Sequence, residues 1–333
     1  MRRQRLGRST TEVTELGFGG GPLGGLFEPL DDATAAGALA AAWDAGVRYY
    51  DTSPHYGIGT SERRTGAALR ARARDAGRDA GRDGFTVSTK VGRLLVEQDA
   101  QGRQDPQGFQ VPATHRRVWD FTRDGVRRSL EDSLARTGLD RVDALYLHDA
   151  EEHFEDALRE GYPALDELRA EGVVGAIGAG MYDPDKLTRL VRETDVDVVM
   201  LSGRYTLLNH TALDTLFPAC AERGVSVLAA SVFNSGLLAT AEPGAAGMYD
   251  YAPAPPGLVD RARRIAGVCA AHGVELPAAA LAFPLRHPVV AGIVVGMRSA
   301  DEVRANVASY ETEIPEALWS DLRDAGLLDE RTP

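Results

Sequence analysis

Four ionisable side chains stand where short, apolar, β-prone runs of the sequence end. Asp51 closes the run VRYY, and Tyr56 follows it five residues later. Lys90 directly follows the run FTVST, and His148 is the last residue of VDALYLH. If these runs are neighbouring parallel strands, their carboxyl ends meet at one rim, and we expect the four groups to converge there.

The types of these residues suit proton transfer. A buried lysine is costly unless a carboxylate pairs with it, and Asp51 is the natural partner of Lys90. A positive charge beside a tyrosine favours the phenolate, so we expect the pKa of Tyr56 to lie below its usual value of about 10. His148 can hydrogen-bond a reacting oxygen and orient it. The four residues together predict an enzyme that moves a proton to or from an oxygen atom.

The rest of the chain must position these groups. It has 333 residues, 44% of them apolar, and short β-like runs alternate with helix-length amphipathic segments. Apolar strands that alternate with helices pair in parallel, and about eight such units close a barrel of this length. We predict a single domain over residues 1–333, a (β/α)8 TIM barrel with an N-terminal β-hairpin. The predicted strands cover residues 14–18, 47–50, 85–89, 142–148, 173–178, 196–201, 225–230 and 292–296.

Two long polar stretches break this alternation. Residues 92–119 are rich in Gly, Pro and Gln, and residues 240–257 follow the seventh predicted strand. Connections of this length are uncommon unless they are functional, and both would follow strand carboxyl ends, so we predict two long catalytic-face loops. Residues 71–84 are also polar, and we predict that they form the frayed, solvated end of a helix.

Composition and charge exclude several classes of function. The formal net charge is −12 and the pI is about 5.1. Because an acidic protein repels polyanions, we do not expect nucleic acid or an anionic membrane as a partner. We expect the two cysteines to be buried thiols in a reducing compartment. The basic N-terminus is not followed by an apolar region typical of a signal peptide. We expect a cytoplasmic monomer or homodimer that acts on a small molecule. The seven histidines show no HxH or HExxH spacing, so no metal site is predicted.

Three separated motifs resemble those of a known family. YDTSPHYG, followed by Ser61 and Glu62, then STK and LYLHD are similar to the catalytic signatures of the aldo-keto reductases, in the same order. The resemblance runs over nearly the whole chain. It implies a (β/α)8 barrel with a nicotinamide cofactor extended across its mouth. It also implies a catalytic tetrad in which Tyr56 is the general acid/base, Lys90 lowers its pKa, Asp51 holds the lysine and His148 orients the substrate oxygen.

The cofactor positions implied by this resemblance are partly replaced. Gly180 and Met181 stand where the family has a Ser-Asn pair for the nicotinamide carboxamide. Ser202 stands at the usual glutamine position, and Ala230 replaces the aromatic residue that commonly stacks on the nicotinamide. Tyr205 is close by, and it is either a compensating contact or a core residue.

Two further segments match the parts of the family that hold the dinucleotide phosphates. ASVFNSGLL matches the pyrophosphate loop, and VVGMRSADEVRANV matches the adenosine-phosphate segment. Two arginines in the second segment can clamp a 2′-phosphate, which favours NADP; if they are surface charges, NAD suffices. The predicted contacts are Ser231, Phe233, Ser235 and Gly236 in the first segment and Arg298, Ser299, Arg304 and Asn306 in the second.

One branch of the family is more similar than the rest. GAGMYD, LSGRYTLL and SVFNSGLL resemble aldose dehydrogenases, which oxidise L-fucose, L-galactose or D-arabinose at C1 to the lactone, and the related pyridoxal 4-dehydrogenases. A sugar site needs polar groups and an apolar or aromatic platform. His55, Trp119 and Phe121 are the substrate candidates, and Tyr249 or Tyr251 is a further rim aromatic.

Other functions remain open on these residues. A broad NADPH-dependent aldehyde or ketone reductase would share every catalytic residue. A cofactor-sensing binding subunit would not need an activated phenol, so the complete tetrad argues against it. A phosphate-binding barrel of different chemistry would carry glycine-rich phosphate loops after its last two strands rather than the motif YDTSPHYG.

Overall fold

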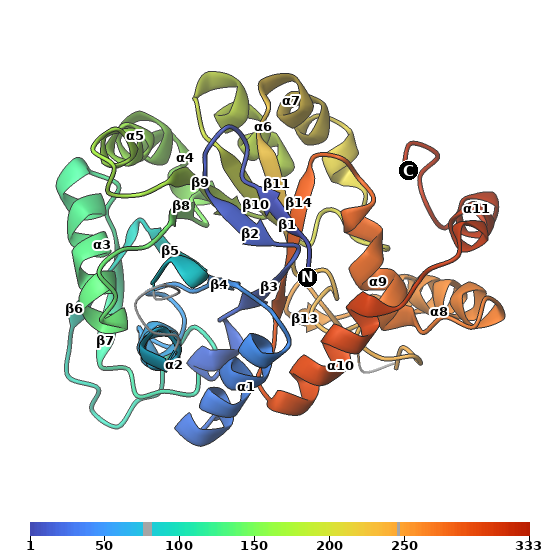
Figure 1. Cartoon of the computed structure of the whole chain (residues 1–333), viewed down its shortest axis with the longest axis horizontal. Helices are drawn as coiled ribbons and strands as arrows, with labels where there is room; N and C mark the ends of the chain where they lie inside the picture. The colour runs from blue at the N-terminus through green and yellow to red at the C-terminus, as the bar shows by residue number, and fades with distance from the viewer. Residues whose placement is uncertain (76–81, 245–246) are drawn as a thin grey trace.

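Eight parallel strands close a barrel in the computed structural model, which describes residues 1–75, 82–244 and 247–333 (Figure 1). The last strand pairs with the first, so the sheet has no free edge. The (β/α)8 prediction is confirmed. The strands, in their order around the barrel, are β3 (Leu16–Gly19), β4 (Tyr49–Asp51), β5 (Thr86–Val91), β8 (Ala144–His148), β9 (Ala176–Met181), β10 (Val198–Ser202), β11 (Ser226–Ala230) and β14 (Val290–Gly296).

Helices form a layer around the outside of the barrel (Figure 1). Side-chain oxygens of Asp31, Thr122, Asp183 and Ser299 accept hydrogen bonds from backbone N–H groups of the first helical turns, as helix N-caps do. The helices are α1 (Asp32–Asp44), α2 (Thr60–Asp75), α3 (Arg123–Thr137), α4 (Phe154–Asp156), α5 (Tyr162–Ala170), α6 (Pro184–Glu193), α7 (Leu216–Arg223), α8 (Pro256–Ala271), α9 (Leu276–Leu285), α10 (Ala300–Glu311) and α11 (Glu316–Asp324).

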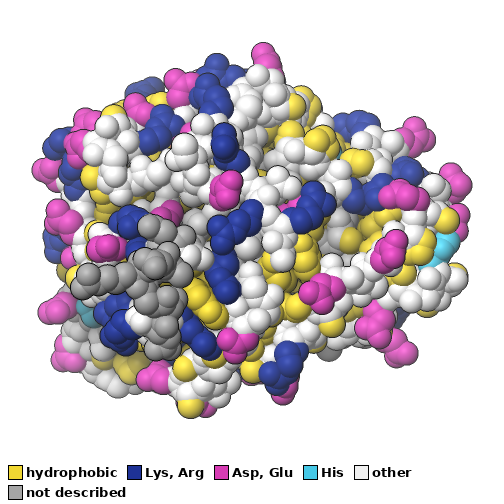
Figure 2. Space-filling view, in the orientation of Figure 1, with side chains coloured by type: hydrophobic (Ala, Val, Ile, Leu, Met, Phe, Trp, Pro, Cys, Tyr) yellow, Lys and Arg dark blue, Asp and Glu magenta, His cyan; other side chains and the backbone are white. Residues whose placement is uncertain are grey.

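An N-terminal hairpin closes one end of the barrel, as predicted. It consists of β1 (Arg3–Arg5) and β2 (Glu12–Thr14). The fully buried Leu6 and Val13 pack with side chains at the beginnings of several barrel strands. Figure 1 looks onto this end, and Figure 2 shows basic and acidic side chains intermixed over the same face. The opposite end, where the strands terminate, is left for the functional loops.

The connection after β5 is more ordered than its composition suggests. Residues 92–119 contain an antiparallel hairpin, β6 (Arg93–Glu97) paired with β7 (His115–Trp119). Arg117 forms two hydrogen bonds of 2.7 Å to the carboxylate of the buried Asp105, which ties the tip of this connection to its stem. Within residues 240–257, β12 (Met248–Tyr249) pairs with β13 (Ala252–Pro253).

Two of the remaining sequence predictions concern segments away from the strands. Cys220 on α7 and Cys269 on α8 are buried, unpaired thiols. Helix α2 ends at Asp75, and residues 76–81 of the predicted frayed helix end lie outside the described residues. Among the residues described, no single helix is long and apolar enough to cross a bilayer, whereas α8 and α9 pass that test only as a pair bent by 95°.

Helices α2 and α3 approach closely and hold the wall beside β5. The buried Glu62 on α2 accepts hydrogen bonds from Thr89 of β5 at 2.8 Å and from Arg136 of α3 at 2.5 Å. A side chain at Gly66 of α2 would place its Cβ 2.0 Å from the carbonyl oxygen of Thr137. The absence of a side chain at Gly66 therefore permits the contact that Glu62 bridges.

We expect Gly66→Ala to destabilise the protein by about 1–3 kcal/mol, because the added methyl group forces α2 away from α3. The matched control is Gly37→Ala in α1, where an added Cβ meets no atom within 4 Å. There, alanine should stabilise by up to about 1 kcal/mol through helix propensity. Thermal unfolding of the two variants measures the difference. Equal midpoints would contradict the close α2–α3 contact.

Candidate active site

A cavity of about 640 Å³ lies at the carboxyl ends of the barrel strands. The tetrad predicted from the sequence lines it, together with the long connections that follow the strands. The last residues of seven strands contribute to its floor and walls: Gly19, Asp51, His148, Met181, Ser202, Ala230 and Gly296.

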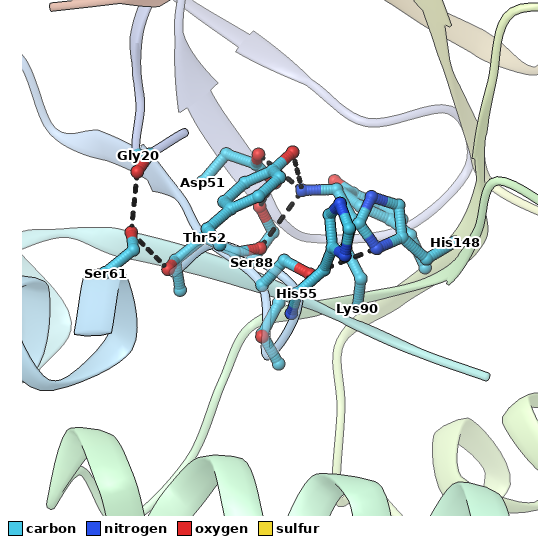
Figure 3. A network of polar contacts seen from close by, with 12 residues as sticks. Gly20, Asp51, Thr52, His55, Ser61, Ser88, Lys90 and His148 are labelled. Carbon is cyan, nitrogen blue, oxygen red and sulfur yellow. Dashed lines mark hydrogen bonds and ion pairs between the residues drawn. The ribbon is translucent and has the colours of Figure 1, made fainter. Parts of the chain in front are cut away.

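A buried ion pair stands at the base of this cavity (Figure 3). Lys90 Nζ lies 2.6 Å from Asp51 Oδ2, and both side chains are 2% exposed. The ammonium also donates to the carbonyl oxygen of Thr52 at 3.0 Å and to the hydroxyl of Tyr56 at 3.1 Å. The second oxygen of Asp51 accepts from Ser88 at 2.7 Å. The charges are thus fully hydrogen-bonded, as charges inside a protein must be.

The loop after β4 brings Tyr56 over this pair. Gly57 has φ +61°, and a Cβ there would lie 2.3 Å from the carbonyl oxygen of Gly24, so glycine is required for the turn. Ser61 donates to the carbonyl oxygen of Gly20 at 2.7 Å and contacts the hydroxyl of Thr52 at 2.8 Å. These contacts, visible in Figure 3, fix both ends of the loop.

Electrostatics hold Lys90 charged and Tyr56 protonated. Burial alone would lower the pKa of Lys90, but the neighbouring Asp51 and Tyr56 raise it above its usual value. Burial raises the pKa of Tyr56 well above its usual value, and the charge of Lys90 offsets this only in part. The prediction that the Tyr56 pKa lies below about 10 is therefore contradicted. The sequence shows the cation beside the phenol, but it does not show how completely the ring is desolvated.

Two neutral histidines stand beside the phenol, with their rings 5.5 Å apart. Burial lowers the pKa of His148, and nearby Arg93 and Lys90 lower it further. Burial and the charges of Arg93, Arg117 and Lys90 lower the pKa of His55 to about 2. His148 Nδ1 lies 3.0 Å from Ser53 Oγ. Both rings therefore act as neutral hydrogen-bonding groups over the working pH range.

The geometry matches what comparison with known proteins finds. Residues 15–326 match the sequence model of the Aldo/keto reductase family. The chain belongs to this family. It is 49% identical over 320 residues to a D-threo-aldose 1-dehydrogenase from Pseudomonas sp, which covers 95% of each chain. It is 38% identical over 345 residues to a pyridoxal 4-dehydrogenase from Microbacterium luteolum, which covers 98% of each.

A solved structure has the same architecture. The aldo-keto reductase from Bacillus halodurans, in its holo form, superposes with a TM-score of 0.74 at 25% identity, covering 100% of this chain and 98% of that one. As a member of the aldo/keto reductase family, this protein is an oxidoreductase that uses a nicotinamide dinucleotide. Within the described residues, no group of three or more His, Cys, Asp or Glu side chains is placed to hold a metal ion.

The loop after β11 fits the phosphates of such a cofactor. Ser231 lines the cavity, and its hydroxyl lies 2.9 Å from that of Ser202. Three non-glycine residues of the loop, Ser231, Asn234 and Ser235, have φ between +46° and +56°. Such turns direct successive backbone N–H groups toward an anion, and strain of this kind is concentrated at ligand sites. Asn234 of this loop is not among the contacts predicted from the sequence, and its buried Oδ1 has no partner among the described residues.

The structure does not bring all predicted cofactor residues to the cavity. Gly180, Ser202 and Ser231 line it, whereas Phe233, Ser235 and Gly236 follow Ser231 in the same loop and are not part of the lining. Tyr205 is 1% exposed and packs on Phe217 and Phe283 at ring distances of 4.5 and 4.9 Å. It is a core residue, the second of the two possibilities open from the sequence, because its ring points into the layer between barrel and helices.

The four contacts predicted in the adenosine-phosphate segment do not line the cavity, although Val294 and Gly296 at the start of that segment do. Arg298 is hydrogen-bonded to Glu28, and Arg304 to Asp301. Ser299 caps α10 by accepting from the backbone of Glu302 at 3.1 Å. Asn306 lies on the same helix. Both arginines therefore already have carboxylate partners, which the sequence alone does not show.

Only one of the three predicted substrate residues lines the cavity. His55 lines the cavity, but Trp119 and Phe121 do not. Phe121 is 4% exposed and lies against Gly92, where a Cβ would meet its ring at 2.3 Å. Trp119 stacks on Phe121 at 5.8 Å. Several lining residues were not predicted from the sequence, among them Phe27, Phe109, Asp149, Tyr182, Arg204 and Asp250.

Proposed function

We propose that this enzyme is an aldose 1-dehydrogenase that oxidises sugars such as L-fucose, L-galactose or D-arabinose at C1 to the lactone. The observation that carries the proposal is the cavity in which Tyr56 Oη stands 3.1 Å from the buried ammonium of Lys90. Charged and polar groups, including Asp149 and Arg204, line the same cavity and suit a ligand with several hydroxyls. The 49% identity to a D-threo-aldose 1-dehydrogenase supports this substrate class.

The proposed chemistry assigns a role to each tetrad residue. Tyr56, ionised, takes the proton of the C1 hydroxyl while the hydrogen on C1 leaves as hydride, so that the C–O bond becomes a carbonyl. The nicotinamide, when bound, supplies the hydride acceptor. Lys90 stabilises the phenolate, Asp51 keeps Lys90 in place, and His148 donates to the reacting oxygen and orients it.

The direction of the Tyr56 pKa shift sets the pH dependence. Burial raises this pKa, so at neutral pH only a small fraction of the phenol is ionised. Below the pKa, that fraction grows tenfold with each pH unit, so sugar oxidation should accelerate as the pH rises. The reverse reduction needs the protonated phenol and is favoured at neutral and lower pH.

Pyridoxal oxidation is the second candidate. A pyridoxal 4-dehydrogenase matches the chain over 98% of each sequence, and aromatic rings line the outer part of the cavity. Phe27 and Tyr251 face each other there with ring centroids 6.0 Å apart. Such rings suit a flat heteroaromatic substrate as well as the apolar face of a sugar. A broad NADPH-dependent reductase would use the same tetrad without either substrate preference.

We expect NAD rather than NADP to be the preferred dinucleotide, a reversal of the preference expected from the sequence. The clamp that would favour NADP consists of Arg298 and Arg304, and each is paired with a carboxylate. The N-terminal turn of α10 also carries Asp301 and Glu302, which would repel a 2′-phosphate. NAD requires neither arginine to leave its partner.

The proposed function is tested by initial rates with L-fucose, D-arabinose, L-galactose and pyridoxal, each with NAD and NADP. We expect reduction of NAD with at least one of the sugars. Tyr56→Phe should abolish turnover while still binding NADH, because the variant lacks only the phenolic hydroxyl that transfers the proton. Tyr310→Phe, in α10 and outside the cavity lining, is the matched control and should retain activity.

Each other outcome selects a different function. Oxidation of pyridoxal alone would show that the second candidate function, pyridoxal oxidation, is the correct one. Activity only on aldehydes with NADPH would make it a general reductase. Full activity of Tyr56→Phe would contradict the mechanism for every substrate.

The dinucleotide preference has its own test. Replacing both partners, as Glu28→Gln with Asp301→Asn, frees the two arginines and should raise the affinity for NADP relative to NAD by about tenfold, as expected for new charge-assisted contacts. Fluorescence titration with NADPH and NADH measures this without turnover. Glu313→Gln, an exposed carboxylate beyond α10, is the control. An unaltered enzyme that binds NADPH more tightly than NADH would contradict the proposed preference.

A further inference from the structure

Asp149, directly after the catalytic-motif histidine, has an unusual conformation. Its φ is +41°, in the left-handed region that non-glycine residues seldom adopt, and its backbone N–H donates to the carbonyl oxygen of Gly180 at 2.8 Å. Its carboxylate lines the cavity, and the side chain is 37% exposed. A strained backbone that presents an acid to a cavity indicates a ligand-binding role.

Arg93 fixes the orientation of this carboxylate. Its guanidinium donates to Asp149 Oδ2 at 2.8 Å and reaches His55 Nδ1 at 3.3 Å. It also lies over the ring of Trp119, 4.4 Å from the centroid. Arg93 and Trp119 are paired residues at the open end of the β6–β7 hairpin. The hairpin after β5 therefore presents one arginine that holds Asp149 in place.

The contacts of the two histidines determine what each can offer a ligand. A guanidinium only donates hydrogen bonds, so His55 Nδ1 accepts from Arg93 and the proton of this neutral ring is on Nε2. With its proton on Nε2, the neutral His148 accepts from Ser53 Oγ through Nδ1 at 3.0 Å and turns its ring N–H toward the Asp149 carboxylate, whose Oδ2 lies 3.5 Å from Nε2. The cavity therefore offers two ring N–H donors beside one carboxylate acceptor.

This arrangement matches two neighbouring hydroxyl groups. The oxygen that reacts must lie within hydrogen-bond reach of Tyr56 and of His148 Nε2. Asp149 stands next to that position, because its carboxylate is 3.5 Å from the same nitrogen. A hydroxyl on the adjacent carbon can donate to Asp149 while it accepts a hydrogen bond from a ring N–H.

We propose that Asp149, oriented by Arg93, binds the hydroxyl on the carbon next to the reacting carbon and so makes the enzyme selective for substrates that carry this hydroxyl. The inference rests on the proposed aldose oxidation. Asp149 is then a specificity-determining residue outside the tetrad. Arg93 is a positioning residue that acts through Asp149.

A purely structural role for Asp149 makes a different prediction. If the carboxylate only held Arg93 or His148 in place, its loss would slow every substrate by the same factor. Loss of a hydrogen bond to one hydroxyl instead slows only substrates that have that hydroxyl. The ratio of rates on a sugar and on its 2-deoxy analogue therefore separates the two roles.

The experiment compares kcat/KM for L-fucose and 2-deoxy-L-fucose with NAD. In the unaltered enzyme, L-fucose should be preferred by about 10–100-fold, the range for a hydrogen bond to a charged group. In Asp149→Asn the preference should fall below about threefold, mainly through slower oxidation of L-fucose. Arg93→Met should reduce the same ratio. If Asp149→Asn does not fold, Asp149→Gly also removes the carboxylate and suits the positive φ.

Asp250→Asn is the matched control, because Asp250 also lines the cavity and pairs with an arginine, Arg204, at 3.0 Å. Its rates can change, but its ratio between the two sugars should not. An Asp149→Asn enzyme that keeps the preference overturns the inference, as does an unaltered enzyme without any preference. If the unaltered enzyme oxidises another aldose instead of L-fucose, the same ratio is measured with that aldose and its 2-deoxy analogue. If it oxidises none of L-fucose, L-galactose and D-arabinose, the proposed function fails first, and the inference fails with it.

Discussion

The ion pair between Lys90 and Asp51 is the interaction on which the rest of the site depends. Both side chains are 2% exposed, and a buried charge costs several kcal/mol unless a partner and hydrogen bonds compensate it. That compensation requires β4 and β5 to be neighbours in register, with Ser88 beneath the carboxylate and the Thr52 carbonyl beside the ammonium. The closed barrel supplies these positions together.

The same pair links the barrel interior to the cavity. A chain of polar contacts runs from Tyr146 through Tyr49 and Ser88 to Asp51, and Lys90 then reaches Tyr56. Every member except Tyr56 comes from a strand, so the phenol is held against a rigid base. Connected networks of this kind resist rearrangement. The network therefore keeps the Tyr56 hydroxyl, which would transfer the proton, at a fixed distance from the Lys90 ammonium.

The sequence predicts the parts of this enzyme that depend on local patterns. The alternation of strands and helices identifies the barrel, and residues at strand ends identify the tetrad, because parallel strands bring their carboxyl ends together. Desolvation and long-range partners are not local. The raised pKa of Tyr56, the core position of Tyr205 and the Arg298–Glu28 pair therefore appear only in three dimensions. The motif LYLHD contains Asp149, but the orientation of its carboxylate depends on a hydrogen bond from Arg93, 56 residues earlier in the chain.

The most direct test of the proposed mechanism is the pH dependence of kcat/KM for sugar oxidation in the unaltered enzyme and in Lys90→Met. If Lys90 stabilises the Tyr56 phenolate, log kcat/KM should rise with pH in both, and the Lys90→Met curve should lie about 1–3 pH units higher. Asp51→Asn combined with Lys90→Met removes both charges and provides the same comparison if the single variant does not fold. A flat profile, or superimposable curves, would contradict the mechanism.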